Sequence, residues 1–390
     1  MPRPVSPSAD RPPTRARHLA VLGTALAVLG VTLTLTLHPG PAGRTGSADR
    51  ATPAAAVTPP IGHVFVINIE NKSFARTWGS GSAAPYLASR LRAKGVLLRR
   101  YYATAHHSLG NYLAQVSGQG PDSAIQGDCP RYTAFRPTRS DVAPQQAVGN
   151  GCVFPRSVRT LPRQLSKAGL DWKGYLEDMA RPCQHPQPGA TDPWFRATAA
   201  SQYATRHNPF VYFASITSRP AYCRAHVVNL DRLSADLQAT STTPALSYLT
   251  PDLCHDGHDR SCADGGPGGL PAVNAWLKTW VPRILHSPAY QADGLLVITA
   301  DESDGVAQDS SACCGEGPGP NAARPGIKGP GGGRVGALVL SPYAVPGATS
   351  TRAYNHYSLL ATIEDLFGLD RIGYARTAPR TFGSDVFAAH

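Results

Sequence analysis

Two kinds of apolar pattern alternate along this chain: short unbroken runs and longer repeats at helical spacing. HVFVINI and GLLVITA are unbroken runs of the kind that form strands buried on both faces of a sheet. With weaker runs, they predict strands over residues 63–69, 172–178, 245–250, 294–300 and 335–341. Apolar residues that recur every three or four positions predict helices over residues 84–94, 112–118, 160–168, 271–285 and 354–369. Because the strands alternate with helices, we expect a layered α/β fold.

Polar clusters directly follow three of the predicted strands. They are Glu70–Asn71 after 63–69, Asp256 and His258 after 245–250, and Asp301–Glu302 after 294–300. In α/β folds, ligands bind beyond the carboxyl ends of the strands. We therefore expect these side chains to share one site.

Asp301 and Glu302 are adjacent carboxylates at the end of a fully apolar strand. Two such charges are costly side by side unless a cation neutralises them, which favours a metal site. The alternative is a turn or helix cap, where acidic residues are common. Glu70–Asn71 has a similar alternative reading, as a polar pair in a turn at the end of its strand.

The loop CHDGHD, residues 254–259, combines two histidines with two carboxylates. Asp256 and His258 there are a zinc-like ligand set, although an isolated polar turn with exposed histidines would explain the loop as well. His356 precedes the apolar stripe of a predicted helix. A charged histidine is disfavoured at a helix N-terminus, so a neutral ligand fits that position, with a capping or core role as the alternative.

Ser108 lies in TAHHSLGNYLAQVSGQ, just before an apolar helical run. A serine at this place is either a helix N-cap or a catalytic nucleophile. Acidic and histidine clusters at strand ends, together with a serine that opens a helix, are typical of a two-metal phosphoryl-transfer site. Metal coordination would lower the pKa of the serine hydroxyl and activate it.

The N-terminal region predicts export. Four arginines precede the uncharged run LAVLGTALAVLGVTLTLTL at residues 19–37, so residues 1–38 are a signal peptide or a retained membrane anchor. Residues 39–60 are rich in Pro, Ala and Gly and predict a disordered linker, which leaves 61–390 as the globular domain. The apolar content of 42% is sufficient for a large core.

The eight cysteines agree with export, because an even number in an exported chain indicates disulfides. Neighbours in sequence suggest the pairs Cys129–Cys152, Cys183–Cys223 and Cys254–Cys262. Cys313 and Cys314 are adjacent, which makes a bond between them awkward, so pairing elsewhere stays open. No paired CxxC spacing indicates a zinc knuckle.

The net charge of +11 favours anionic substrates. No run of Lys and Arg is interleaved with aromatic residues, so we expect no nucleic-acid partner.

Five motifs occur in the order found in the phosphoesterase family of bacterial and fungal acid phosphatases and phospholipases C: HVFVINIENKSF, ATAHHSLGNYLAQVSGQ, CHDGHD, VITADESDG and YNHYSLLATIEDLFGL. The chain resembles this family over about residues 61–385, and most resembles its branch of acid and phosphoinositide phosphatases. The family belongs to the alkaline-phosphatase-like superfamily. The resemblance therefore implies a three-layer α/β/α sandwich around a mostly parallel sheet.

The resemblance also implies roles for individual residues. Ser108 would be the nucleophile and Asn111 a phosphate contact, with Glu70, Asn71, Asp301 and Glu302 at one metal. Asp256, His258 and His356 would build a second metal site or contact phosphate. His207 of RHNPF recurs in relatives, but the resemblance assigns it no role.

The chain departs from the family at the nucleophile turn. Relatives carry proline where this chain has His107 and Gly110, and their loss should loosen the turn that aims Ser108. His107 could instead add a donor to phosphate. No Cys-x-Pro-x-Arg is present, which disfavours the sulfatase branch.

The sequence therefore predicts an exported, monomeric phosphoric-ester hydrolase with one or two divalent ions, which could be zinc, calcium, magnesium or manganese. A phosphomonoesterase that acts through a seryl-phosphate is the first expectation, and a phospholipase C-type diesterase is the second. The substrate would be a phosphorylated small molecule or a phospholipid headgroup, with membrane association through residues 19–37 as an open alternative. A non-catalytic, cation-binding surface protein with the same fold is the rival from another class.

Overall fold

The structure is a computed structural model that describes residues 59–378 and 380–388. The expected export segment 1–38 and nearly all of the linker 39–60 lie outside these residues, and so does the proposed anchor at 19–37. Within the described residues, no helix is both long enough and apolar enough to cross a membrane.

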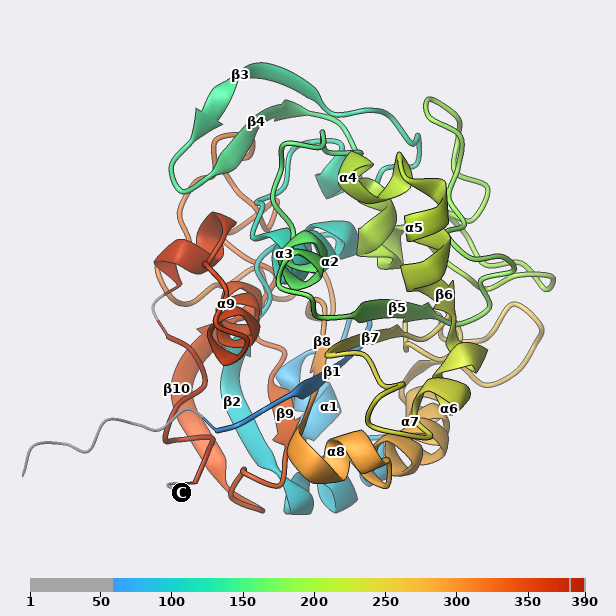
Figure 1. The fold of residues 1–390 in the computed structure, drawn as a ribbon, viewed down its shortest axis with the longest axis vertical. Coiled ribbons are helices and arrows are strands. Elements are labelled where there is room, and N and C mark those ends of the chain that lie inside the picture. Colours follow the sequence, from blue (N-terminus) through green and yellow to red (C-terminus); the bar gives the residue numbers. More distant parts are fainter. Residues whose placement is uncertain (1–58, 379, 389–390) are drawn as a thin grey trace, which may run out of the picture. The chain divides into compact units, whose positions relative to one another are not determined.

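An eight-stranded sheet forms the centre of the described domain, in the order β10-β2-β9-β8-β1-β7-β5-β6 (Figure 1). Its strands are β1 (His63–Ile69), β2 (Val96–Tyr102), β5 (Trp172–Leu176), β6 (Val227–Asn229), β7 (Leu246–Thr250), β8 (Gly294–Ala300), β9 (Ala337–Leu340) and β10 (Thr349–Asn355). β9 runs antiparallel to both of its neighbours, and the other pairs are parallel. A separate hairpin joins β3 (Arg136–Val142) to β4 (Gln146–Asn150).

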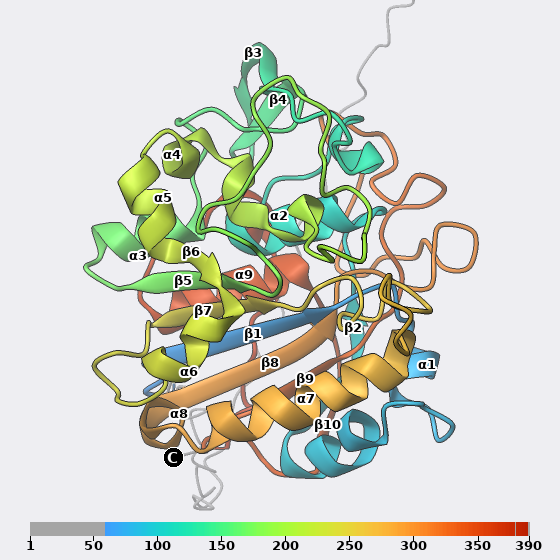
Figure 2. The same ribbon diagram turned by 90° about the vertical axis from the view of Figure 1, so that its right-hand side faces the viewer.

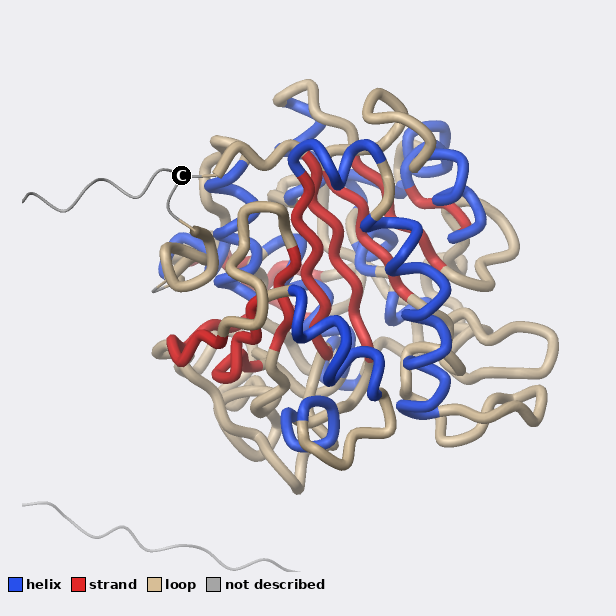
Figure 3. The backbone as a smooth tube through the Cα atoms, turned by 90° about the horizontal axis from the view of Figure 1, so that it is seen from below, coloured by secondary structure: helices blue, strands red, loops and turns tan. Residues whose placement is uncertain are grey.

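Helices cover both faces of the sheet and make the predicted three layers (Figure 2). The helices are α1 (Phe74–Trp78), α2 (Ser108–Ser117), α3 (Leu161–Lys167), α4 (Ala214–Thr217), α5 (Pro220–His226), α6 (Leu233–Asp236), α7 (Gly269–Leu285), α8 (Pro288–Asp293) and α9 (His356–Leu366). α2, α3 and α9 lie on one face, and α7 and α8 lie on the other. The α/β fold class is thus confirmed. Long loops surround the ends of the strands (Figure 3).

The strongest strand predictions are confirmed to the residue. Every residue of β1 and β8 is buried, because these neighbouring strands lie in the middle of the sheet with helices on both faces. A strand covered on both sides reads as an unbroken apolar run, which is why the sequence identified both.

Three helix predictions need correction. The helix expected over 112–118 begins four residues earlier, at Ser108, as α2. Residues 84–94 form a π-helical turn over Tyr86–Leu91 and a 3₁₀ turn over Arg92–Lys94 rather than one α-helix. The helix expected from residue 354 begins at His356, because Tyr354 and Asn355 belong to β10 and the Asn355 side chain accepts from the Ser358 N–H as the N-cap. β2, β6 and β10 were not predicted.

Four disulfides link the eight cysteines. The pairs Cys129–Cys152, Cys183–Cys223 and Cys254–Cys262 are confirmed. Cys313 and Cys314 bond to each other, so the idea that they pair elsewhere is wrong: every other cysteine already has its partner.

Candidate active site

The carboxyl ends of β1, β7 and β8 bring three carboxylates together. Ile69 and Ala300 are paired in register, so Glu70 and Asp301 leave the sheet side by side. The Asp301 N–H donates to the Ile69 carbonyl at 2.9 Å, and the Glu70 N–H donates to the Asp256 carbonyl at 2.7 Å. The backbone itself therefore places these three acids, as the strand-end argument predicted.

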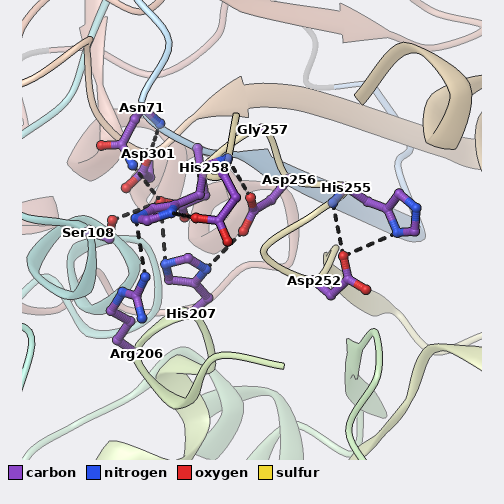
Figure 4. Close-up of polar contacts among 12 residues, drawn as sticks. Asn71, Ser108, Arg206, His207, Asp252, His255, Asp256, Gly257, His258 and Asp301 are labelled. Atoms are coloured by element: carbon purple, nitrogen blue, oxygen red, sulfur yellow. Dashed lines mark hydrogen bonds and ion pairs between the residues drawn. The ribbon is translucent and has the colours of Figure 1, made fainter. Parts of the chain in front are cut away.

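Ser108 is the first residue of α2, and its side chain does not cap that helix. His107 is the N-cap residue and makes no side-chain capping bond. The Ser108 hydroxyl instead donates to Glu70 Oε2 at 2.8 Å (Figure 4). The N-cap interpretation of this serine is wrong, because its oxygen points into the acidic cluster.

His207 completes the cluster, and sequence reasoning left it without a role. Its Nδ1 lies 3.0 Å from Asp256 Oδ2, and its Nε2 lies 3.4 Å from Glu70 Oε2. The ring stacks on Tyr112 with centroids 5.4 Å apart, and the Tyr112 hydroxyl donates to Glu70 Oε1. The only available signal was the recurrence of RHNPF in relatives, since nothing local marks His207 as part of a site.

Asn71 turns the chain back over the cluster. It has a left-handed φ of 51°, and its N–H donates to Asp301 Oδ1 at 3.0 Å. Its side-chain amide lies 3.4 Å from Glu70 Oε2. Asn71 therefore orients two of the acids, and its own amide oxygen has no partner among these contacts.

The cluster is electrostatically costly as it stands. Glu70, Asp256 and Asp301 are fully buried. Burial is the main cause that raises the pKa of each: well above its usual range for Glu70 and Asp256, and to about 6 for Asp301. The charge of Asp301 adds to the rise at both of the other acids.

The Lys72 ammonium offsets part of the negative charge of the three acids. Its ammonium donates to the backbone carbonyls of Glu70, Asn71 and Gly257 at 3.1, 3.2 and 2.7 Å. Burial lowers its pKa, while the nearby acids act to raise it. One cation cannot neutralise three carboxylates.

A divalent cation fits the residues at this site. Glu70, His207 and Asp256 offer ligand atoms that all lie within 4.8 Å of one another. With Asp256 ionised, His207 Nδ1 carries the proton and leaves the Nε2 lone pair facing the Glu70 carboxylate without a hydrogen bond. Asp301 Oδ2 is also buried without a partner. Such orphaned acceptors around one point are what a bound cation would satisfy.

Glu302 follows Asp301 in the chain, but its carboxylate interacts with a histidine outside this cluster. Its carboxylate pairs with His106 Nδ1, and His106 Nε2 lies 2.9 Å from the Asp309 carbonyl. Both residues are buried. In this structure Glu302 therefore positions the segment before Ser108 instead of facing the other acids.

His356 is neutral, as expected, but both of its nitrogens are in use. Burial lowers its pKa to about 4. Nε2 lies 2.6 Å from the Asp301 carbonyl, and Nδ1 lies 3.1 Å from both the Tyr101 hydroxyl and the Gln115 amide. The ligand role expected for His356 does not match this geometry, because neither ring nitrogen has a free lone pair for a metal. The ring instead contacts the backbone carbonyl of Asp301.

Asn111 is occupied within the nucleophile turn. Its Oδ1 accepts from the N–H groups of Thr104 and Ala105, both at 2.9 Å. Its Nδ2 donates to the carbonyls of Ala105 at 2.9 Å and His107 at 3.2 Å. In this arrangement Asn111 holds the turn and has no free donor for phosphate. These bonds stiffen a turn that lacks the two prolines of the family.

Close packing explains why a glycine stands at position 110. A Cβ atom at this position would lie 2.9 Å from the Ala105 Cβ, which is closer than side-chain carbons approach. The turn therefore folds tightly against the start of α2 at Gly110.

A cleft with a volume of about 580 Å³ is lined by His107, the residue before Ser108. His107 is exposed on its wall, and His258 lies at its edge. The Arg206 guanidinium lies 3.2 Å from His258 Nε2 and 3.7 Å from Asp128 Oδ2. His258 Nδ1 bonds to Asp259 at 2.7 Å, so His258 faces the cleft and Arg206 rather than the acidic cluster. Arg206 and Asp128 were not predicted.

The Phosphoesterase family model matches residues 80–370. A phosphatidylinositol-3-phosphatase of Mycobacterium tuberculosis is 27% identical over 93% of this chain and 95% of its own length. A probable acid phosphatase of Kluyveromyces lactis is 24% identical over 84% of this chain and 64% of its own length. A hemolytic phospholipase C of Pseudomonas aeruginosa is 26% identical over 54% of this chain and 30% of its own length.

The chain therefore belongs to the Phosphoesterase family, and it is a hydrolase that acts on phosphoric esters. Among solved structures, a Vibrio parahaemolyticus protein of the alkaline phosphatase superfamily is similar over 80% of this chain and 67% of its own length, with 11% identity and a TM-score of 0.47.

Proposed function

We propose that this protein is an exported, metal-dependent phosphomonoesterase with Ser108 as its nucleophile. The observation that carries the proposal is the Ser108 hydroxyl, which donates to Glu70 inside a buried cluster of three carboxylates and His207. Burial lowers the pKa of His207 well below its usual range, so its ring is neutral. A serine hydroxyl needs an acceptor for its proton and a stabilised transition state before it can attack phosphorus. This cluster supports the first requirement, and the positive end of α2 supports the second.

In the first half-reaction Ser108 Oγ attacks phosphorus and the bond to the leaving oxygen breaks. The serine proton passes towards the Glu70 carboxylate and leaves with the alcohol, so that a seryl-phosphate remains. In the second half-reaction water attacks the seryl-phosphate, inorganic phosphate departs, and the proton returns to Ser108.

Glu70, His207, Asp256 and Asp301 would hold one divalent ion. When bound, the ion supplies Lewis-acid stabilisation of the phosphoryl oxygens and lowers the pKa of the nucleophile. A histidine among carboxylates favours zinc or manganese over calcium. We propose one ion, because His258 and His356 contact other groups and the described residues offer no second set of free ligands around them.

The cleft favours an anionic monoester. Arg206 and Arg196 line it together with His107 and His258, and Asp128 and Asp259 line it too. The two guanidinium groups are the side chains that would complement a dianionic phosphate. The phosphatase relatives agree with this class, and the substrate would be a phosphorylated small molecule or a lipid headgroup. A phospholipase C-type diesterase is the second candidate, on the similarity to the Pseudomonas enzyme.

Four disulfides support an oxidising compartment outside the cytoplasm. This agrees with the basic and apolar N-terminal pattern. Whether residues 19–37 are removed or kept as an anchor is tested by N-terminal sequencing of the mature protein.

The test compares Ser108→Ala with Ser117→Ala, a buried serine at the other end of the same helix whose hydroxyl donates to the Leu113 carbonyl. On p-nitrophenyl phosphate, Ser108→Ala should lose at least about 10³-fold in kcat/KM and the control should lose little. Mass spectrometry of acid-quenched enzyme should find phosphate on Ser108. Full activity of Ser108→Ala would overturn the proposal.

Two further measurements decide the remaining points. Dialysis against EDTA should remove activity, and re-addition of zinc or manganese should restore it. Turnover of bis(p-nitrophenyl) phosphate faster than the monoester would favour the diesterase. Binding of phosphate esters without any turnover would favour the non-catalytic rival.

A further inference from the structure

A small cavity of about 130 Å³ lies apart from the cleft and is walled by segments far apart in the sequence. Cys314 and Glu316 come from the loop after β8, Tyr357 comes from α9, and Tyr374 comes from the 3₁₀ turn Gly373–Thr377. The volume is close to the ~150 Å³ of an engineered cavity that holds one benzene molecule. The cavity therefore has room for one compact group.

Glu316 is the one charged side chain among the described residues that line this cavity. The Asn355 amide donates to its Oε1 and fixes the carboxylate in place. Its Oε2 is buried and has no hydrogen-bond partner. Burial raises the pKa of Glu316 to about 7, as expected for a carboxylate without a counter-charge.

Two tyrosine rings also line this cavity. The Tyr357 and Tyr374 ring centroids lie 5.1 Å apart, with the planes tilted by 55°. Tilted aromatic faces attract a cation through the negative charge of their π-systems. In a chain of net charge +11, the lining of this cavity thus has one acid, two tyrosine rings and no lysine, arginine or histidine.

We propose that this cavity binds a small organic cation, an alkylammonium group, between the Glu316 carboxylate and the rings of Tyr357 and Tyr374. The positive charge of such a group compensates the negative charge at the unpaired Glu316 Oε2. Its methyl or methylene groups pack against the rings of Tyr357 and Tyr374. A neutral occupant without a hydrogen-bond donor would leave Oε2 unpaired, and a neutral donor would leave its charge without a counter-charge. A calcium ion favours several carboxylate ligands, and the lining of this cavity offers one carboxylate, that of Glu316.

One residue that lines the cavity also contacts the turn that precedes Ser108. Thr104 lines the cavity, and its N–H donates to Asn111, the residue that holds the segment before Ser108. Tyr357 follows His356, which contacts the Asp301 carbonyl. An occupant therefore touches two segments that support the acidic cluster without entering it, and its binding does not depend on the proposed chemistry.

The test is isothermal titration calorimetry of the full chain at about pH 8, where most of Glu316 is ionised. The probes are choline, phosphocholine, and the carbon isostere of choline in which a tert-butyl group replaces trimethylammonium. Choline should bind at least about tenfold more tightly than the isostere. Phosphocholine is titrated into Ser108→Ala so that it is not hydrolysed.

Glu316→Gln should weaken binding at least about tenfold, because it removes the charge and keeps the shape. Tyr374→Leu should weaken it about fivefold, because it keeps apolar volume and removes the π-face. Glu177→Gln, a change at a half-buried acid that pairs with His255, is the matched control and should bind choline like the wild type. Thermal unfolding checks that each variant is folded.

The outcomes separate the sources of the ligand. Binding of free choline that requires Glu316 supports a site for a free amine. Binding of phosphocholine alone, again weakened by Glu316→Gln, supports a site for the headgroup of a phosphate ester. Equal affinity for the neutral isostere, unchanged binding in both variants, or no binding of either cation overturns the proposal. Because Ser108→Ala should still bind choline, failure of the nucleophile assignment and failure of this site are distinguishable.

Discussion

Replacing Asp301 with asparagine should stabilise the metal-free protein at neutral pH while abolishing activity. Asp301 is fully buried, its Oδ2 has no partner, and its charge acts on Glu70 and Asp256. An asparagine keeps the shape and can still accept the hydrogen bond from the Asn71 N–H. The substitution therefore removes the cost of a buried charge without creating a cavity.

The magnitude follows from the pKa of Asp301, which burial raises from the ordinary value of 3.8 to about 6. A raised carboxyl pKa means that the folded state prefers the protonated acid. Stability is therefore full below the unfolded pKa, falls as the pH rises between about 4 and 6, and stays reduced above. A shift of about two units at about 1.4 kcal/mol each is worth roughly 3 kcal/mol at neutral pH. For a domain of this size that corresponds to roughly 4 °C in Tm.

The assay is thermal unfolding after dialysis against EDTA, near pH 4 and at about pH 8. The Asp301→Asn variant should exceed the wild type in Tm only at the higher pH. Saturating zinc or manganese should reverse the order there, because the wild type binds the ion and the variant has lost a ligand.

Glu364→Gln is the matched control. Glu364 is buried in α9, accepts from the Ile372 N–H, and has a pKa raised by burial to about 9. Its replacement should also stabilise the protein at neutral pH, but metal should not reverse the effect and activity should persist. If Asp301→Asn lowered Tm at both pH values, the carboxylate would be a net stabilising group and the argument from orphaned charge would be refuted.

Three further predictions concern the support of Ser108 and the fold. His207→Gln should lower kcat about 10²-fold and weaken metal affinity in a competition titration, whereas an effect on Tm alone would reject a role in the site. Asn111→Ala should cost about 2 kcal/mol and lower kcat, while Asn111→Asp, which keeps the acceptor for two backbone N–H groups, should recover part of the stability; equal Tm of the two variants would contradict this account of the turn. Removing the Cys129–Cys152 disulfide, which closes a 23-residue separation, should cost about 3 kcal/mol in chemical unfolding, and a change below about 1 kcal/mol would contradict it.

The buried strands and the acids that follow them could be read from the sequence. β1 and β8 are unbroken apolar runs because helices cover both faces of the sheet there. Once these strands are assigned as parallel neighbours, the convergence of Glu70 and Asp301 follows from the shared direction of the strands.

β2 and β10 could not be read in the same way. β10 is the polar segment TSTRAYN at the edge of the sheet, and β2 contains two exposed arginines. Nothing in their local pattern requires a strand. They are strands because they pair with each other in parallel and β2 also pairs with β9, and these contacts exist only after the chain has folded.

The site, like the sheet, has features that the sequence predicts and features that depend on tertiary contacts. The sequence alone determined which residue types follow the strands and which serine opens α2, because local order and strand direction are sufficient for that. Only the tertiary structure decided how each polar atom is used. It placed His207 between Asp256 and Glu70, and it bound both nitrogens of His356. A hydrogen bond depends on distances of a few tenths of an ångström between segments far apart in the chain, and sequence spacing does not carry that information.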